Sequence, residues 1–149
     1  MLSTVEVTVE AFVHELREGY RRTWGDVEPE VPSIIAWAAS TTLEVISQSD
    51  ALYHDVEHTI HVTLVGQELL RGLHIKRGGV SPVDWLQVVV SLLCHDIGYV
   101  RGICRRDDGA VCATGKGDET VTLPEGSTDA ALTPWHVERA RLFVEERFA

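Results

Sequence analysis

Two short segments carry ionisable side chains at positions that a helical core would normally fill with apolar ones. In the first segment, 53–62, the histidines recur at intervals of four and three residues: His54, His58 and His61. At about 100° per residue, these positions fall on one face of a helix. The same face continues through apolar residues, Val62, Val65 and Leu69. We therefore expect the three imidazoles to point inward.

The second segment, 92–99, ends an apolar run with His95 and Asp96. A carboxylate at the C-terminus of a helix opposes the helix dipole, and burying it without a partner costs several kcal/mol. A divalent cation bound by His58, His95 and Asp96 is the simplest partner. Nitrogen and oxygen ligands of this kind suit Mn, Fe, Ni, Zn or Co, with Mg at an oxygen-rich second site.

Two motifs resemble those of a known family: His54-Asp55-x-x-His58 and His95-Asp96-x-Gly98. They are similar to the motifs of the HD-domain metal-dependent phosphohydrolases. The first is nearest to the Tyr-His-Asn-x-x-His motif of the cyclic-nucleotide phosphodiesterases. The resemblance implies an all-α, HD-domain-like helical bundle with one or two divalent metal ions. It also implies hydrolysis of a small phosphorylated substrate, such as a nucleotide or cyclic nucleotide.

The resemblance also assigns roles to particular side chains. It implies that His54 is the general acid that protonates the leaving oxygen, although Asp55 stands where the phosphodiesterases have Asn. Some relatives bind a second metal through extra histidines, for which His136 is the candidate here. Arg101 and Lys116 are candidates for contacting a phosphate. A capping histidine and a solvated basic loop are the alternatives for these three residues.

One departure from the family pattern concerns the last metal ligand, an aspartate on a helix well beyond the His-Asp pair. In this chain, Asp118 and Asp129 follow that pair too closely and lie in a loop region. We therefore expect the fourth ligand beyond residue 149, in C-terminal helices that this chain lacks. A rival function is consequently a catalytically inactive HD fold that binds a ligand or another protein.

The length of 149 residues predicts a single domain, 1–149. The net charge of −10 argues against nonspecific binding to nucleic acid or to anionic membranes. The chain has no apolar run of the about 18 residues that a membrane span needs, and no signal segment, so we expect a cytoplasmic protein. Its three cysteines lack CxxC spacing and are expected to be reduced thiols rather than a zinc clip. The sequence names neither the substrate nor the oligomeric state.

Apolar periodicity predicts helices over 5–24, 34–48, 51–71, 82–94 and 134–148. We expect Ser49 or Asp50 to cap the third helix and Gly72 to end it. For the second helix, the pattern predicts an inward face of Ile34, Trp37, Ala38, Thr41 and Val45. For the last helix, it predicts Val137, Ala140, Val144 and Phe148. The segment 99–133 is expected to be an insertion, with a small β-hairpin formed by 111–114 and 120–123.

Overall fold

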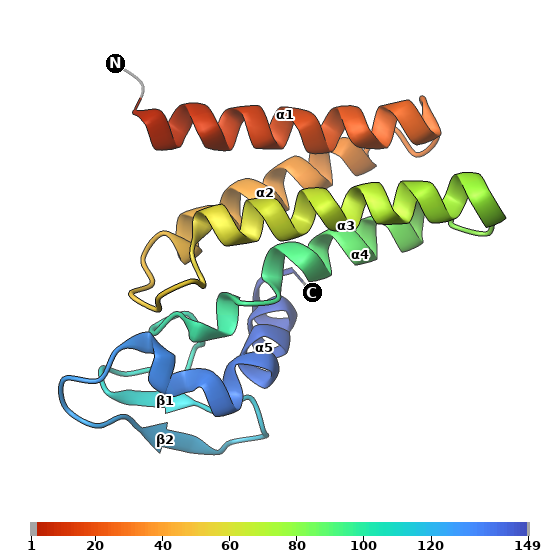
Figure 1. Cartoon of the computed structure of the whole chain (residues 1–149). Helices are drawn as coiled ribbons and strands as arrows, with labels where there is room; N and C mark the ends of the chain where they lie inside the picture. The colour runs from red at the N-terminus through yellow and green to blue at the C-terminus, as the bar shows by residue number, and fades with distance from the viewer. Residues whose placement is uncertain (1–2, 149) are drawn as a thin grey trace. The chain divides into compact units, whose positions relative to one another are not determined.

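The computed structural model describes residues 3–148, which are mostly helical with one two-stranded hairpin before the last helix (Figure 1). The chain divides into two compact units. Unit 1 contains the described part of Met1–Leu43 together with Thr59–Leu93. Unit 2 contains Glu44–His58 and the described part of Cys94–Ala149. None of the helices formed by residues 3–148 combines the length and the apolar content that crossing a membrane requires.

The α-helices of residues 3–148 are α1 (Thr4–Trp24), α2 (Val31–Ile46), α3 (Val56–Arg77), α4 (Pro82–Cys94) and α5 (His136–Phe148). Two short 3-10 helices lie in unit 2, η1 (Ile97–Tyr99) and η2 (Asp129–Trp135). The antiparallel strands of the hairpin are β1 (Val111–Ala113) and β2 (Thr120–Thr122). In the register of this hairpin, Cys112 is opposite Val121.

Unit 1 is built around apolar stripes on its helices. The buried side chains of α1 and α4 recur at four-residue spacing: Phe12, Leu16 and Tyr20 on α1, and Trp85, Val89 and Leu93 on α4. Gly19 lets the buried Gln67 of α3 approach α1, since a Cβ at Gly19 would lie 2.3 Å from the Gln67 Nε2 atom. The N-terminus of α1 is closed by a capping box between Ser3 and Glu6.

The buried face of α2 differs from the predicted one. Ile34 and Trp37 are exposed, whereas the buried residues are Val31, Pro32, Ile35, Ala38, Ala39, Thr42, Leu43 and Ile46. The helix begins at Val31 rather than at residue 34. Because α2 is apolar almost all round, its sequence fits two neighbouring stripes equally well, and only packing selects one of them.

The prediction for α3 was wrong in its start, its end and its inward face. Asp55 is the residue that caps the helix, because its Oδ1 accepts a hydrogen bond of 2.9 Å from the backbone N–H of His58. The helix continues through Gly72 to Arg77. Its buried residues are Thr59, Ile60, Thr63 and Gln67, whereas His61, Val65 and Leu69 are exposed.

Arg139 organises the packing of unit 2. Its guanidinium is fully buried and makes a two-pronged ion pair with the equally buried carboxylate of Asp107, at 2.9 and 3.0 Å. It also donates to the backbone carbonyls of Gly98, Val100 and Ala113. Burial raises the pKa of Asp107, but the hydrogen bonds and charge of Arg139, together with hydrogen bonds from the backbone N–H groups of Ala113 and Cys104, outweigh it and hold the pKa below the ordinary value of 3.8. One side chain of α5 thus ties η1, β1 and the intervening loop together.

The last helix begins at His136, after η2, rather than at residue 134. Its buried residues are Arg139, Ala140 and Phe143. Val137 is exposed, contrary to the predicted face. The three cysteines are buried and lie outside any disulfide, and burial raises the pKa of Cys104 to about 12.

Gly98 is required by a close backbone contact between η1 and α5. A Cβ at this position would lie 1.8 Å from the carbonyl oxygen of His136. We predict that Gly98→Ala lowers the free energy of unfolding by about 3 kcal/mol or more, because backbone atoms cannot move aside cheaply. Gly72→Ala is the matched control: nothing lies within 4 Å of a Cβ there, and the change should stabilise the helix by about 1 kcal/mol. Urea unfolding of both variants is the measurement, and equal effects would contradict the packing argument.

Candidate metal centre

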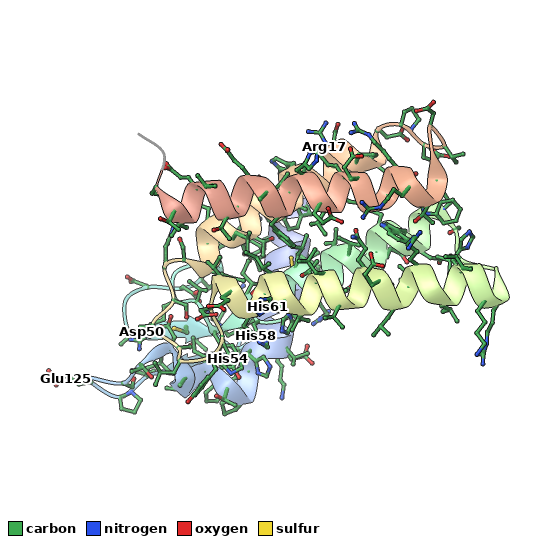
Figure 2. All side chains as sticks on the ribbon, turned by 45° about the horizontal axis from the view of Figure 1, so that its top comes forward. Arg17, Asp50, His54, His58, His61 and Glu125 are labelled. Atoms are coloured by element: carbon green, nitrogen blue, oxygen red, sulfur yellow. The ribbon has the colours of Figure 1, made fainter. Side chains whose placement is uncertain are left out.

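The first half of the candidate site is the turn into α3. His54 lies in the loop just before the helix, and His58 lies in the first helical turn, where Asp55 caps the backbone. Figure 2 shows the two imidazoles near each other, and their ring centroids are 5.9 Å apart. His61 lies further along α3 and is exposed, so the cap rather than a three-histidine helical stripe brings His54 and His58 together.

The second half is the turn after α4. The helix ends at Cys94, and His95 and Asp96 connect it to the buried η1. Backbone contact between Gly98 and the start of α5 supports this turn from behind. Only 5% of the Asp96 side chain is exposed. The glycine of the His-Asp-x-Gly motif therefore has a structural role: it permits the close packing of η1 against α5 that holds Asp96 in place.

Three imidazoles converge on one carboxylate oxygen in unit 2. The Oδ2 atom of Asp96 lies 2.8 Å from Nδ1 of His54, 3.2 Å from Nε2 of His58 and 3.0 Å from Nε2 of His95. The Nε2 atoms of His58 and His95 are 3.3 Å apart. The structure thus brings together all four residues that the sequence motifs single out. We call His54, His58, His95 and Asp96 the four-residue cluster.

The electrostatics of the cluster favour an ionised carboxylate. Burial raises the pKa of Asp96, but hydrogen bonds and charge from His95 and His54 outweigh it and lower the pKa to about 2. About a third of each imidazole side chain remains exposed, 34% for His54, 38% for His58 and 32% for His95. The carboxylate is therefore buried, whereas the imidazoles around it remain partly open to water.

The separations within the cluster fit a shared divalent ion. With metal–ligand bonds of about 2.1 Å, two ligand atoms lie about 3.0 Å apart at a right angle and about 3.4 Å apart at a tetrahedral angle. The four separations in the cluster, 2.8 to 3.3 Å, are close to this range. His54, His58 and Asp96 can hold a metal through ligand atoms that all lie within 4.8 Å of one another. The Nε2 atom of His95 lies 3.0 Å from the same carboxylate oxygen, Oδ2 of Asp96, and could be a further ligand.

His136 lies outside the cluster, on the other face of a tyrosine ring. Tyr99 stacks on His54 with centroids 4.3 Å apart, and on His136 with centroids 4.5 Å apart. Nδ1 of His136 is 2.7 Å from the carbonyl oxygen of Thr133. Since a carbonyl only accepts, this nitrogen carries the proton. The second-metal role of His136 stays a prediction, and the geometry shows a stacking role.

Arg101 and Lys116 also lie outside the four-residue cluster. Arg101 pairs with the buried Asp129 at 2.8 Å and donates to the carbonyl of Ser127. Asp129 in turn accepts from the Ser49 hydroxyl at 3.0 Å and from the Asp50 backbone at 3.3 Å. Arg101 thus helps to tie the loop before α3 to the segment before η2. Lys116 is exposed in the turn between β1 and β2.

Sequence reasoning missed the residues that support the cluster. Tyr99 carries a weak signal, because it follows the His-Asp-x-Gly motif directly. Asp129 and Arg139 carry no such signal, since nothing in the sequence around a buried charged residue distinguishes it from an exposed one. Their partners lie far along the chain: Asp50 is 79 residues from Asp129, and Asp107 is 32 residues from Arg139.

A family model, described as Npun_R2479-like, matches residues 2–149. The match covers almost the whole chain, which therefore belongs to this family. No curated protein and no solved structure matches the chain significantly.

Proposed function

We propose that this member of the Npun_R2479-like family is a metal-dependent hydrolase of phosphate esters, with the four-residue cluster as its metal centre. The observation that carries the proposal is the convergence of three imidazole nitrogens on the Oδ2 atom of Asp96. Imidazole and carboxylate are ligands for Mn, Fe, Co, Ni and Zn, and three or four protein ligands leave positions for water and substrate. The HD-domain resemblance of the motifs adds the reaction class.

The chain's own residues would contribute binding, orientation and charge. When bound, a divalent ion supplies a source of hydroxide at neutral pH and a positive charge for a phosphoryl oxygen. Asp96 provides the buried negative charge that attracts such an ion. The stack on Tyr99 restricts the rotation of the His54 ring and so keeps the imidazole in one orientation.

His54 has two possible roles in this site, and they predict different losses. If His54 is a metal ligand through Nδ1, replacing it should weaken metal binding. If His54 is the general acid, replacing it should leave metal binding intact. Hydrolysis should then slow by about 10²–10⁴-fold, and only for substrates whose leaving oxygen needs a proton. We predict the second outcome for His54→Gln when a phenyl ester is compared with a p-nitrophenyl ester, whose leaving group needs no acid. Equal losses on both esters, together with lost metal, would instead assign His54 as a ligand.

A binding module without catalysis is the second candidate function, and one observation favours it. Three arginines downstream of Asp96 already have partners within the protein: Arg101 pairs with Asp129, Arg106 pairs with Asp118, and the Arg105 guanidinium donates to the backbone carbonyl of Glu146. A phosphate would have to compete with these two carboxylates and this carbonyl, or rely on the metal and Lys116. The net charge of −10 makes this competition harder.

An assay of the purified chain separates the two functions. The protein is loaded with Mn, Zn, Fe, Co, Ni or Mg in turn, and hydrolysis of bis-p-nitrophenyl phosphate is followed beside metal content. Turnover that requires metal and disappears in Asp96→Asn supports the hydrolase. Stoichiometric metal without turnover on aryl, nucleotide or cyclic-nucleotide esters supports the binding module. Protein that takes up no metal contradicts both uses of the cluster.

A further inference from the structure

A polar hollow lies between α1 and α2 in unit 1. It has a volume of about 360 Å³, and its polar lining consists of Glu10, His14, Arg17 and Arg21 of α1 and Ser40 of α2. Small-molecule sites in proteins occupy about 300–1,000 Å³, so there is room for a small ligand. The lining residues all belong to unit 1, whereas the four-residue cluster was described within unit 2. We call this site the α1–α2 hollow.

Arg17, labelled on α1 in Figure 2, is the unusual side chain of this hollow. Its Nε atom is buried and has no hydrogen-bond partner within residues 3–148. An arginine that only covers apolar surface with its stem keeps its charged head in water. Here part of the charged head is itself buried, and a buried donor without an acceptor is unfavourable. The Nε atom therefore indicates an acceptor that the described residues do not supply.

The sequence of α1 places no acidic residue where it could neutralise Arg17. Residues three and four positions apart are neighbours on a helix surface. Around Arg17, these positions are occupied by Val13, His14, Tyr20 and Arg21. Arg21 already pairs with Glu18 at 2.9 Å. Glu10, the acid of the lining, is seven residues from Arg17, which is about 10 Å along the helix axis. The counter-ion of Arg17 should therefore come from outside the helix.

We propose that the α1–α2 hollow binds a phosphate group, either as free phosphate or as part of a small phosphorylated molecule. A guanidinium presents several N–H donors in a planar fork that matches phosphate oxygens. His14 and Arg21 flank Arg17 on α1, and Ser40 lines the hollow from α2. Donors on two helices suit a tetrahedral anion with three or four oxygens better than a carboxylate with two.

The charge of the lining sets where the anion binds. The net charge of −10 repels an anion over most of the protein surface. Arg17 and Arg21 oppose this field towards the C-terminal end of the lined stretch of α1, whereas Glu10 adds to it towards the N-terminal end. Phosphate should therefore lie beside the two arginines, and Glu10 should weaken its binding. This proposal does not rest on the hydrolase function.

Titration of the isotope-labelled chain with inorganic phosphate, followed by NMR at constant ionic strength, tests the proposal. Prior treatment with EDTA keeps phosphate from binding through a metal in the four-residue cluster. We expect saturable shifts of the α1 and α2 amides around Arg17 and Ser40, with a dissociation constant below about 10 mM. Arg17→Met should weaken binding by about 10-fold or more, because a charge-assisted hydrogen bond is lost. Arg77→Met is the matched control, since it removes the same charge from an exposed arginine of α3, and it should bind as wild type does.

Glu10→Gln provides a gain of binding that a folding defect cannot imitate. Removing this carboxylate should tighten phosphate binding by about threefold at low ionic strength. Three results would overturn the proposal: shifts that do not saturate, equal affinities in wild type and Arg17→Met, or no gain in Glu10→Gln.

Comparison of ligands identifies the source of the phosphate group. Tighter binding of phenyl phosphate or glycerol phosphate than of inorganic phosphate supports a phosphorylated molecule as the ligand. Tighter binding of inorganic phosphate supports the free anion. Acetate that binds as tightly as phosphate would contradict the proposal, because the hollow would then be a general anion site.

Discussion

Replacing Asp96 with asparagine should abolish stoichiometric metal binding while leaving the helices intact. The substitution keeps the shape of the side chain but removes the negative charge on which His54, His58 and His95 converge. Changes to residues that only support a metal ligand cost about 10–100-fold in affinity, so the loss of this central ligand should exceed about 100-fold. Metal content after dialysis and calorimetric titration with Zn or Mn are the measurements.

His61→Ala is the control for this experiment. His61 is on the same helix as His58 and is exposed, and it is not part of the four-residue cluster. Its replacement should leave metal affinity unchanged. If His61→Ala and Asp96→Asn weakened binding equally, the metal would lie on the surface of α3 rather than in the cluster.

Replacing Arg139 with methionine should destabilise the protein by about 3–5 kcal/mol, because it leaves the buried carboxylate of Asp107 without its counter-ion. Three backbone carbonyls, those of Gly98, Val100 and Ala113, would also lose a donor. Arg141→Met is the matched control on the same helix. Arg141 pairs with Glu138 and Glu145 but is 59% exposed, so its replacement should change stability by less than about 1 kcal/mol.

The effect of Arg139→Met should depend on pH. The pKa of Asp107 in the folded protein is lower than its ordinary value of 3.8, so the ion pair stabilises the fold above that pH. This contribution is lost as the pH falls from 3.8 through the folded pKa. The stability difference between wild type and Arg139→Met should therefore shrink in acid. A difference that is constant from neutral pH to pH 3 would mean that packing, rather than charge, accounts for the loss.

The parts of the fold that the sequence predicted well are those with a local cause. The apolar pattern of α1 and α4 placed both helices within a residue or so of their observed bounds, and reciprocal hydrogen bonds between Ser81 and Asp84 close the start of α4. The hairpin followed from β-forming segments on either side of a glycine-rich turn. The start of α3 was missed because Ser49, Asp50 and Asp55 are all acceptable caps. Asp50 and Ser49 instead bond to Asp129, a distant residue that no local pattern identifies.

The residues of the four-residue cluster were predictable for a different reason. A histidine–aspartate pair at the end of an apolar run is costly unless something compensates it, so its position singled it out, and the resemblance of the motifs to the HD-domain family added His54. The route by which His54 reaches the site was not predictable. It depends on the cap that Asp55 forms at the start of α3 and on the preceding loop, which Asp129 binds through Ser49 and Asp50. The histidine spacing instead suggested one continuous helix. The inward face assigned to Val65 and Leu69 was wrong because amphipathic spacing identifies a stripe but not what covers it.

The hydrogen bonds from Ser49 and Asp50 to Asp129 make the start of η2 a remote determinant of the site. It holds the loop that carries His54, although Asp129 itself is not a member of the cluster. In a mutational scan scored by bound metal, Asp129 and Arg101 should consequently appear as sensitive positions beside the ligands. Anyone shortening this protein to a minimal scaffold would have to retain them.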